Sequence, residues 1–249
     1  MRRIFDDVPV LCGHRGSGAG VVDGRRENTL ASFRAAVDAG LRWVEVDVRV
    51  NADRVLVASH DPVLEDGRYI ADLTSAETDE LELMRLADLL DELPPDVALD
   101  VDVKTSLEDA LLAREQTTAA LAAGVLAGEA ERRPLLVTSF DPAALLIARE
   151  RAPVLPIGLL TWIQFPLRKA IPAAVHLGAE VVVAHVGSFP PDHAAAAWCV
   201  RVAHDAGLQV AVWCPAPEEA ERFAAAGVDC LIVDHESART WASARAPVR

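Results

Sequence analysis

Short apolar runs alternate with longer amphipathic segments along most of the chain. In the longer segments, apolar residues recur every three to four positions, which predicts helices, and several of these segments end at a glycine. The runs that predict strands are residues 10–13, 43–50, 97–104, 135–140, 156–160, 181–186, 209–214 and 230–234. The segments that predict helices are residues 29–39, with Asn28 as the N-cap, 106–123, 142–151, 167–177, 192–206 and 218–226. Eight strands separated by helices in 249 residues predict an α/β fold, a (β/α)8 TIM barrel that forms a single domain over residues 1–249.

One stretch interrupts this alternation. Residues 55–59 predict a further strand, which a hairpin-like turn at residues 51–54 joins to the second strand of the barrel. Residues 61–82 are acidic and irregular, and a helix at about residues 84–93 follows, ending at Pro94-Pro95. We therefore expect a short insertion after strand two, folded over the mouth of the barrel.

The second strand carries two carboxylates on one face. Side chains alternate between the two faces of a strand, so Glu45, Asp47 and Arg49 share one face and the valines share the other. In an open antiparallel sheet this face would be solvated, but a closed barrel covers both faces. Because buried unpaired carboxylates are costly, this face needs a cation, and a divalent metal with oxygen ligands meets the need.

Further polar residues end the other early strands. Barrel enzymes carry their active sites at the carboxyl ends of the strands, so these residues are expected to converge. They are His14-Arg15-Gly16 after the first strand, His60-Asp61 after the hairpin, and Asp100, Asp102 and Lys104 on one face of the third strand. A lone histidine at a strand end is usually structural, and it is the convergence that favours a catalytic site.

The remaining histidines and two tryptophans carry a weaker signal. His176, His185, His193, His204 and His235 are interpreted as structural, although His185 ends the sixth strand and could line the mouth. Trp43 and Trp213 fit a core position, and Trp213 fits the wall of a pocket equally well because it lies near the end of strand seven.

Charge and composition narrow the choice of partners. The formal net charge of −14, with no basic stripe, argues against nucleic acid and against a stable place on an anionic membrane surface. Acidic residues follow Arg2 and Arg3 where a signal peptide would be apolar, and no run approaches the roughly 18 apolar residues of a membrane span. We therefore expect a soluble, cytoplasmic protein. The four cysteines form no CxxC pair, which predicts free thiols.

Several motifs together resemble one known family. They are His14-Arg15-Gly16, Glu27-Asn28-Thr29-Leu30 with Phe33 and Ala36, Glu45-x-Asp47-Val48, His60-Asp61, Asp102-x-Lys104, Ser139-Phe140, Val210-Ala211-Val212-Trp213, Gly227-Val228-Asp229 and Asp234. This set, which spans nearly the whole chain, is similar to the glycerophosphodiester phosphodiesterase family. The resemblance implies a metal-dependent (β/α)8 barrel that hydrolyses glycerophosphodiesters to glycerol 3-phosphate and an alcohol.

The resemblance also implies roles for individual residues. Glu45 and Asp47 would be metal ligands, His14 and His60 the acid–base pair, and Arg15 and Lys104 the groups that grip phosphate. Trp213 would contact substrate, and Glu27 and Asn28 would support the site. Oxygen ligands favour Mg²⁺ or Ca²⁺ over zinc.

Two positions depart from the family pattern. The family has Glu-x-Lys on strand three, whereas this chain has Asp102-x-Lys104, so Asp102 would ligate through a shifted metal or through water. The family's Thr-x-Asp-Gly turn is Asn51-Ala52-Asp53-Arg54 here, which could alter the hairpin.

The chemistry of phosphodiesters supports the same roles. These esters are inert anions, so a catalyst must neutralise developing charge and protonate the leaving alkoxide. The sequence leaves open which histidine is the acid, whether water or a substrate hydroxyl attacks, and the oligomeric state. The partner is expected to be a small-molecule glycerophosphodiester.

Three other functions remain open at this point. A lysophospholipase D or sphingomyelinase D-like enzyme would use the apolar loop at residues 161–167 as a lip for acyl chains. A non-catalytic phosphoester-binding barrel would be expected to lack a histidine or a carboxylate. A lyase or aldolase barrel usually needs a Schiff-base lysine or another ligand set.

Overall fold

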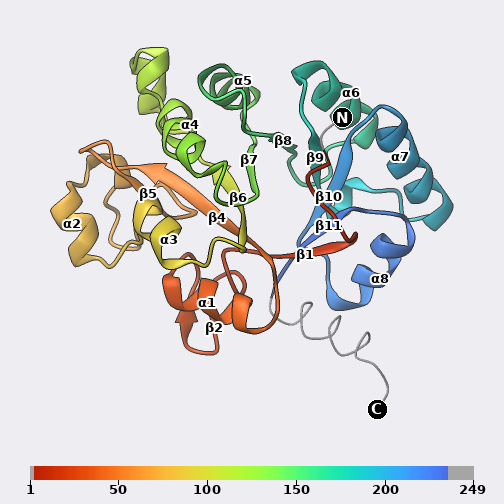
Figure 1. Ribbon diagram of the computed structural model, residues 1–249, viewed down its shortest axis with the longest axis horizontal. Coiled ribbons are helices and arrows are strands. Elements are labelled where there is room, and N and C mark those ends of the chain that lie inside the picture. The colour runs from red at the N-terminus through yellow and green to blue at the C-terminus, as the bar shows by residue number, and fades with distance from the viewer. Residues whose placement is uncertain (1–2, 235–249) are drawn as a thin grey trace.

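Within residues 3–234, which the computed structural model describes, eight parallel strands close into a barrel (Figure 1). The strands are β1 (Val10–Gly13), β4 (Trp43–Val50), β6 (Ala98–Val103), β7 (Leu135–Ser139), β8 (Ile157–Leu160), β9 (Val181–His185), β10 (Gln209–Trp213) and β11 (Cys230–Val233). Each strand pairs with its neighbours in chain order, and β1 pairs with both β11 and β4, which closes the ring. The predicted (β/α)8 barrel is confirmed.

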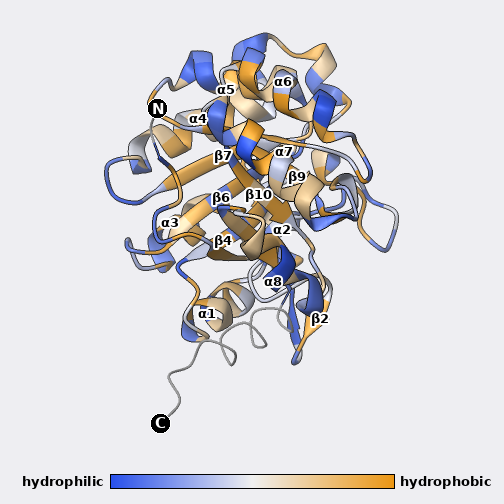
Figure 2. Ribbon diagram, turned by 90° about the vertical axis from the view of Figure 1, so that its right-hand side faces the viewer, coloured by the Kyte–Doolittle hydropathy of each residue, from blue (hydrophilic) through white to orange (hydrophobic). Residues whose placement is uncertain are grey.

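Helices surround the barrel, and its strands consist largely of hydrophobic residues (Figure 2). The helices between successive barrel strands are α1 (Leu30–Asp38), α3 (Leu86–Glu92), α4 (Thr118–Glu129), α5 (Pro142–Arg151), α6 (Leu167–Leu177), α7 (His193–Asp205) and α8 (Pro217–Ala225). The bounds of α5 and α6 are those that the apolar spacing predicts. None of the helices described between residues 3 and 234 has the length and apolar character needed to cross a bilayer.

The insertion after the second barrel strand is present. Strand β5 (Leu56–Ala58) pairs antiparallel with β4, and the chain then passes through a 3₁₀ turn, Ile70–Asp72, and helix α2 (Ser75–Glu80) before α3. Arg54 takes the left-handed conformation, with φ 66°, at the place where the family has glycine. The side chain of Asn51 accepts a hydrogen bond from the backbone of Val55, 2.8 Å away, and holds the turn. The hairpin is therefore retained despite the altered turn.

Three local expectations were wrong or incomplete. The helix expected at residues 106–123 begins only at Thr118, because 3₁₀ turns at Glu108–Leu111 and Arg114–Gln116 precede it and Thr117 caps α4. Helix α1 is capped by Thr29 instead of Asn28. A small hairpin of β2 (Val21–Val22) and β3 (Arg25–Arg26) was not expected, although the Asp-Gly pair between the strands is a hairpin signal.

The inside of the barrel is divided into an apolar layer and a polar layer. The apolar layer closes the amino-terminal end, where the rings of Phe5 and Trp43 meet with centroids 5.1 Å apart. Its buried members are Phe5, Cys12, Trp43, Ala98, Leu136, Leu160, Val181, Val183, Ala211, Cys230 and Ile232. Trp43 is thus a core residue, as predicted. The polar side chains lie above this layer, at the carboxyl ends of the strands.

Arg133 ties the amino-terminal end of the barrel together. Its side chain is fully buried and pairs with Glu129, with 3.3 Å between Nε and Oε2. Its two terminal nitrogens donate to the backbone carbonyls of Leu90, Leu93, Pro94 and Val97, which follow or end α3. The neighbouring Arg132 pairs with the same glutamate but is half exposed.

We predict that Arg133→Ala lowers the free energy of unfolding by about 3 kcal/mol or more, because four backbone carbonyls lose a buried donor and Glu129 loses its buried ion-pair partner. Arg132→Ala is the matched control and should change it by about 0.5 kcal/mol at most. Urea unfolding measures both. Equal stability of the two variants would show that Arg133 does not anchor α3.

Candidate active site

A cavity of about 510 Å³ opens at the carboxyl ends of the barrel strands. It is lined by the predicted site residues His14, Arg15, Glu45, Asp47, His60, Asp102, Lys104 and Trp213. Glu27 and Asn28 stand behind this wall and contact its members. The structure therefore gathers all the predicted site residues in one place.

Three carboxylates form the floor of this cavity. Strands β4 and β6 pair in parallel, with Asp47 opposite Asp102. One oxygen from each of Glu45, Asp47 and Asp102 lies within 4.8 Å of the others, and all three residues are buried. The shorter Asp102 therefore reaches the same point as the carboxylates of β4. Closure of the barrel forces these groups together, since their faces of the two strands both point inward.

Asp47 is the best-compensated of the three. Its carboxylate lies 2.9 Å from Lys104 Nζ and 3.2 Å from Arg15 Nε, and Asn28 donates to it over 2.8 Å. Burial alone would raise the pKa of Asp47, but Lys104, Arg15 and Asn28 outweigh burial and lower it to about 2. Asp47 is therefore ionised at every physiological pH.

Glu45 and Asp102 are less well compensated. Burial and the nearby charge of Asp47 raise the pKa of Glu45 well above its usual value, although the backbone of Arg15 donates to it over 2.8 Å. Burial also raises the pKa of Asp102 to about 6, against the effect of its ion pair with Lys104. Oδ1 of Asp102 is buried and has no hydrogen-bond partner among the described residues. An unpaired buried carboxylate oxygen within a set of oxygen donors fits a divalent cation.

Asp100 lines the same cavity but behaves differently. Thr138 Oγ1 donates to it over 2.7 Å, and the buried residue lies opposite Glu45 in the pairing of β4 with β6, two positions before Asp102. Burial raises the pKa of Asp100 to about 8. Asp100 is therefore neutral at pH 7 and is not one of the clustered donor groups.

The turn after β1 needs a glycine at position 16. Gly16 has φ 92°, and a Cβ there would lie 2.6 Å from Ser32 Oγ and 2.8 Å from the backbone nitrogen of Phe33. This close approach brings the turn against helix α1. Arg15, just before it, places Nη1 2.9 Å and 3.0 Å from the two carboxylate oxygens of Glu27. Glu27 thus supports the site by orienting Arg15.

Asn28 supports the site from the same loop. It has φ 56°, a conformation that asparagine tolerates better than most residues. Its side-chain nitrogen donates to the carboxylate of Asp47, and its side-chain oxygen accepts from the backbone of Asp47 over 3.2 Å. Asn28, which the sequence pattern predicts as a helix cap, instead forms hydrogen bonds with Asp47 on β4.

His14 and His60 lie in contrasting surroundings. Nδ1 of His14 lies 3.0 Å from Asp234 Oδ1 and 3.6 Å from Cys214 Sγ. Burial would lower the pKa of His14, but Asp234, Cys214 and Glu45 raise it well above its usual value. The sequence predicts no role for Asp234 or Cys214 beside His14, because they lie 220 and 200 positions away from it along the chain.

His60 follows β5 and faces the cavity from the insertion. Its Nδ1 lies 2.8 Å from Asp61 Oδ1, and Arg49 donates twice to its backbone carbonyl, over 2.6 Å and 3.0 Å. Burial lowers the pKa of His60, and Asp47 only partly opposes this effect. Arg49 had no predicted role, although it shares its strand face with Glu45 and Asp47.

Aromatic side chains form the opposite wall. Trp213 ends β10 and meets Phe140 edge to face, with centroids 6.0 Å apart, and Trp162 stacks on Phe140 at 4.6 Å. Nε1 of Trp213 is buried and has no hydrogen-bond partner among the described residues. Trp162 and Ile163, from the expected lip, are 67% and 60% exposed at the rim. His185 packs against Trp213 at 4.4 Å, outside the cavity lining, and His235 lies outside the described residues.

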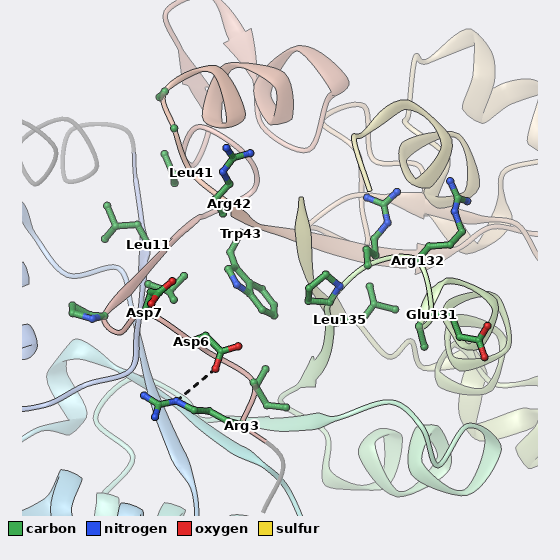
Figure 3. A pocket seen from close by; sticks show the side chains of 18 residues that line it. Arg3, Asp6, Asp7, Leu11, Leu41, Arg42, Trp43, Glu131, Arg132 and Leu135 are labelled. Atoms are coloured by element: carbon green, nitrogen blue, oxygen red, sulfur yellow. Dashed lines mark ion pairs between the residues drawn. The ribbon is translucent and has the colours of Figure 1, made fainter. Parts of the chain in front are cut away.

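A larger cavity, of about 780 Å³, lies at the other end of the barrel (Figure 3). Its lining includes Trp43 and Leu135 at the amino-terminal ends of β4 and β7, and the ion pair of Arg3 with Asp6. None of the predicted site residues is among the described residues that line it. Since barrel enzymes work at the carboxyl ends of their strands, the smaller cavity is the candidate active site.

A barrel with a polar cavity at the carboxyl ends of its strands defines the class, a (β/α)8-barrel enzyme. The model of the glycerophosphoryl diester phosphodiesterase family matches residues 14–237. The chain belongs to this family, which confirms the resemblance in the sequence motifs and makes the protein a phosphodiesterase.

Individual relatives agree with this assignment. A Mycobacterium tuberculosis protein named "Probable glycerophosphodiester phosphodiesterase 1" is 29% identical over 201 residues, covering 70% of this chain and 71% of the relative. A phosphodiesterase structure from Oleispira antarctica, in complex with the product sn-glycerol-3-phosphate, has TM-score 0.78 and 23% identity over 96% of this chain and 97% of that one. A glycerophosphodiester phosphodiesterase from Parabacteroides distasonis has TM-score 0.77 and 21% identity, over 95% and 97%. At these identities the two structures show a shared fold.

We predict that Asp102→Asn weakens binding of Mg²⁺ and Ca²⁺ by about tenfold or more, since it removes the charge of a carboxylate whose Oδ1 has no hydrogen-bond partner among the described residues. Asp100→Asn is the matched control, because Asp100 is neutral and already bonded to Thr138, and its affinity should stay within about threefold of wild type. Isothermal titration calorimetry measures both. Equal weakening by the two variants would remove Asp102 from the ligand set.

Proposed function

We propose that this phosphodiesterase hydrolyses glycerophosphodiesters to glycerol 3-phosphate and an alcohol, with a divalent cation and with His14 and His60 as its acid–base pair. The observation that carries the proposal is the single cavity that holds both histidines, the three clustered carboxylates, Arg15 and Lys104. The product found in the Oleispira antarctica structure supports the same substrate class. The net charge of −14 favours a small-molecule partner over nucleic acid.

Glu45, Asp47 and Asp102 are the residues that would hold the cation. Their all-oxygen donor set favours Mg²⁺ or Ca²⁺. Such an ion supplies positive charge that stabilises the phosphoryl oxygens as the ester bond breaks. The unpartnered oxygen of Asp102 supports this assignment, because the carboxylate has an unused donor position.

Arg15 and Lys104 would bind the phosphate. Both line the cavity and both are held in place by acidic neighbours, Arg15 by Glu27 and Lys104 by Asp47 and Asp102. A guanidinium oriented in this way can donate two parallel hydrogen bonds to a phosphate. Residues that are already oriented lose little freedom when substrate binds, which favours catalysis.

The two histidines divide the proton transfers. The pKa of His14 is raised, so its imidazole is protonated near neutral pH and can give a proton to the leaving alkoxide. The pKa of His60 is lowered, so its imidazole is neutral there and can accept a proton from the attacking hydroxyl group. We propose His14 as the general acid and His60 as the general base. Water and a neighbouring substrate hydroxyl are both compatible with this division.

We predict that His14→Ala and His60→Ala each lower kcat by about a hundredfold or more, the usual scale for loss of a general acid or base. His204→Ala is the matched control, since His204 pairs with Asp229 and is not among the cavity's lining residues. Release of glycerol 3-phosphate from glycerophosphocholine measures the rate, and circular dichroism verifies folding. Near-normal turnover of either active-site variant would rule out the two-histidine mechanism.

The pH profile gives a second test. Activity should fall as pH drops below the lowered pKa of His60, which must be neutral, and again as pH rises above the raised pKa of His14, which must be protonated. Asp234→Asn removes the carboxylate beside His14 and should shift the alkaline limb to lower pH by about one unit. The acid limb should stay in place. An unmoved alkaline limb would contradict the assignment of His14 as the acid.

The exposed rim favours a second candidate substrate, a lysophospholipid. Trp162 and Ile163 place apolar surface beside the cavity mouth, where an acyl chain would lie. Isolated exposed apolar residues are common, but these two are adjacent and continue the aromatic wall. The reaction would be the same cleavage on a larger ester.

We predict that Trp162→Ser lowers the ratio of lysophosphatidylcholine to glycerophosphocholine turnover by about tenfold, because about 1.4 kcal/mol of apolar contact is lost. Leu146→Ser is the control, since Leu146 is exposed on α5 and is not among the residues that line the cavity. Choline release from the two substrates gives the ratio. An unchanged ratio would exclude the rim from acyl recognition.

A further inference from the structure

A second group of metal-ligating side chains lies beside the carboxylate cluster. One donor atom each from His14, Cys214 and Asp234 lies within 4.8 Å of the other two. The three residues directly follow β1, β10 and β11, which are neighbours in the barrel. This group offers nitrogen, sulfur and oxygen, whereas Glu45, Asp47 and Asp102 offer oxygen alone.

The spacing of these donors matches a tetrahedral ion. With Zn–S near 2.3 Å and Zn–N near 2.0–2.1 Å, tetrahedral angles place sulfur and nitrogen about 3.6 Å apart and nitrogen and oxygen about 3.4 Å apart. In the structure, Cys214 Sγ lies 3.6 Å from His14 Nδ1, and Asp234 Oδ1 lies 3.0 Å from it. The sulfur–nitrogen distance fits this geometry, the nitrogen–oxygen distance is about 0.4 Å shorter than it requires, and one donor atom of each residue lies within 4.8 Å of the other two.

Backbone conformation and exposure also favour binding. Cys214 has φ 54°, a left-handed conformation that is unfavourable for a cysteine and follows directly after the strand. Asp234 has a 46% exposed side chain, while that of His14 is 11% exposed. The Asp234 carboxylate is therefore accessible to an ion from solvent, while the imidazole of His14, which would also bind the ion, is nearly buried.

We propose that His14 Nδ1, Cys214 Sγ and the Asp234 carboxylate form a second metal site, which takes a borderline-soft divalent ion such as Zn²⁺ and inhibits the enzyme when filled. Thiolate and imidazole ligands select zinc over Mg²⁺ and Ca²⁺, which prefer oxygen. On binding, the thiol of Cys214 and the Nδ1–H of His14 each release a proton to solvent as the metal–sulfur and metal–nitrogen bonds form. The chain would then hold two sites of opposite preference, with His14 of one lining the same cavity as the three carboxylates of the other.

Inhibition follows from the position of His14. When its Nδ1 binds an ion, His14 loses its hydrogen bond with Asp234, whose carboxylate then binds the ion instead of the ring. The imidazole can no longer hold the extra proton that a general acid must donate. This consequence rests on the proposed role of His14, whereas metal binding itself does not depend on any catalytic assignment.

Binding is tested first, without measuring activity. Co²⁺ and Cd²⁺ are titrated into wild type, Cys214→Ser and Cys199→Ser in excess Mg²⁺, which fills the oxygen site. Cys199, half-buried on α7, is the matched control for a free thiol. We expect a thiolate-to-metal charge-transfer band at one equivalent in wild type and Cys199→Ser, and none in Cys214→Ser. A band that persists in Cys214→Ser, or no band in wild type, would overturn the site.

Inhibition is tested second. Zn²⁺ is titrated into the Mg²⁺-supported reaction, with each variant normalised to its own zinc-free rate. We expect the half-inhibiting zinc concentration to rise at least about tenfold in Cys214→Ser and to stay unchanged in Cys199→Ser. If Cys214→Ser loses the charge-transfer band but inhibition is the same as in wild type, the regulatory claim fails while the metal site stands. If none of the proteins turns over glycerophosphodiesters, the proposed function fails instead.

Discussion

Burial of like charges inside a closed barrel is the constraint on which the rest of the site depends. Pairing of β4 with β6 sets Asp47 opposite Asp102, and closure turns both toward an interior that the apolar layer seals from below. Carboxylates that are buried together must be paired with cations, protonated or bound to a metal. The polar groups around these carboxylates are arranged so that each carboxylate is paired with a cation, protonated or placed to bind a metal.

The neighbouring residues show how the requirement is met. Lys104 and Arg15 keep Asp47 ionised, while burial outweighs Thr138 and Lys104 at Asp100, which takes up a proton instead. The same principle separates the two histidines, since Asp234 offsets the burial of His14 while the environment of His60 leaves burial dominant. Differences in local charge compensation thus produce groups of opposite protonation in one cavity, as acid–base catalysis requires.

Much of the fold could be predicted from the sequence because strand and helix periods are local. The barrel strands were placed within one or two residues, and the alternation in β4 correctly put Glu45 and Asp47 on one face. Local pattern failed where a side chain had a distant partner. Asn28 looked like a helix cap but bonds to Asp47, and the helix expected from residue 106 begins at Thr118, where Thr117 caps it and Asp109 accepts from the backbone of Thr118 over 2.9 Å.

The candidate site was only partly predictable for the same reason. Motifs near the amino terminus identified the groups on β1, β4 and β6, which are close in sequence. The contacts of His14 with Cys214 and Asp234 join residues about 200 positions apart, and only closure of β11 on β1 brings them together. No local spacing encodes that contact, so both the support of His14 and the mixed-donor group emerge from the structure.

The proposed catalysis depends most directly on a cation held by Glu45, Asp47 and Asp102. The decisive measurement is release of glycerol 3-phosphate by protein stripped with EDTA and then titrated with Mg²⁺ or Ca²⁺. We expect stripped protein to be inactive and activity to return as about one equivalent of ion binds per chain. Full turnover by the stripped protein would contradict this claim, because catalysis would then not require an ion bound by the clustered carboxylates.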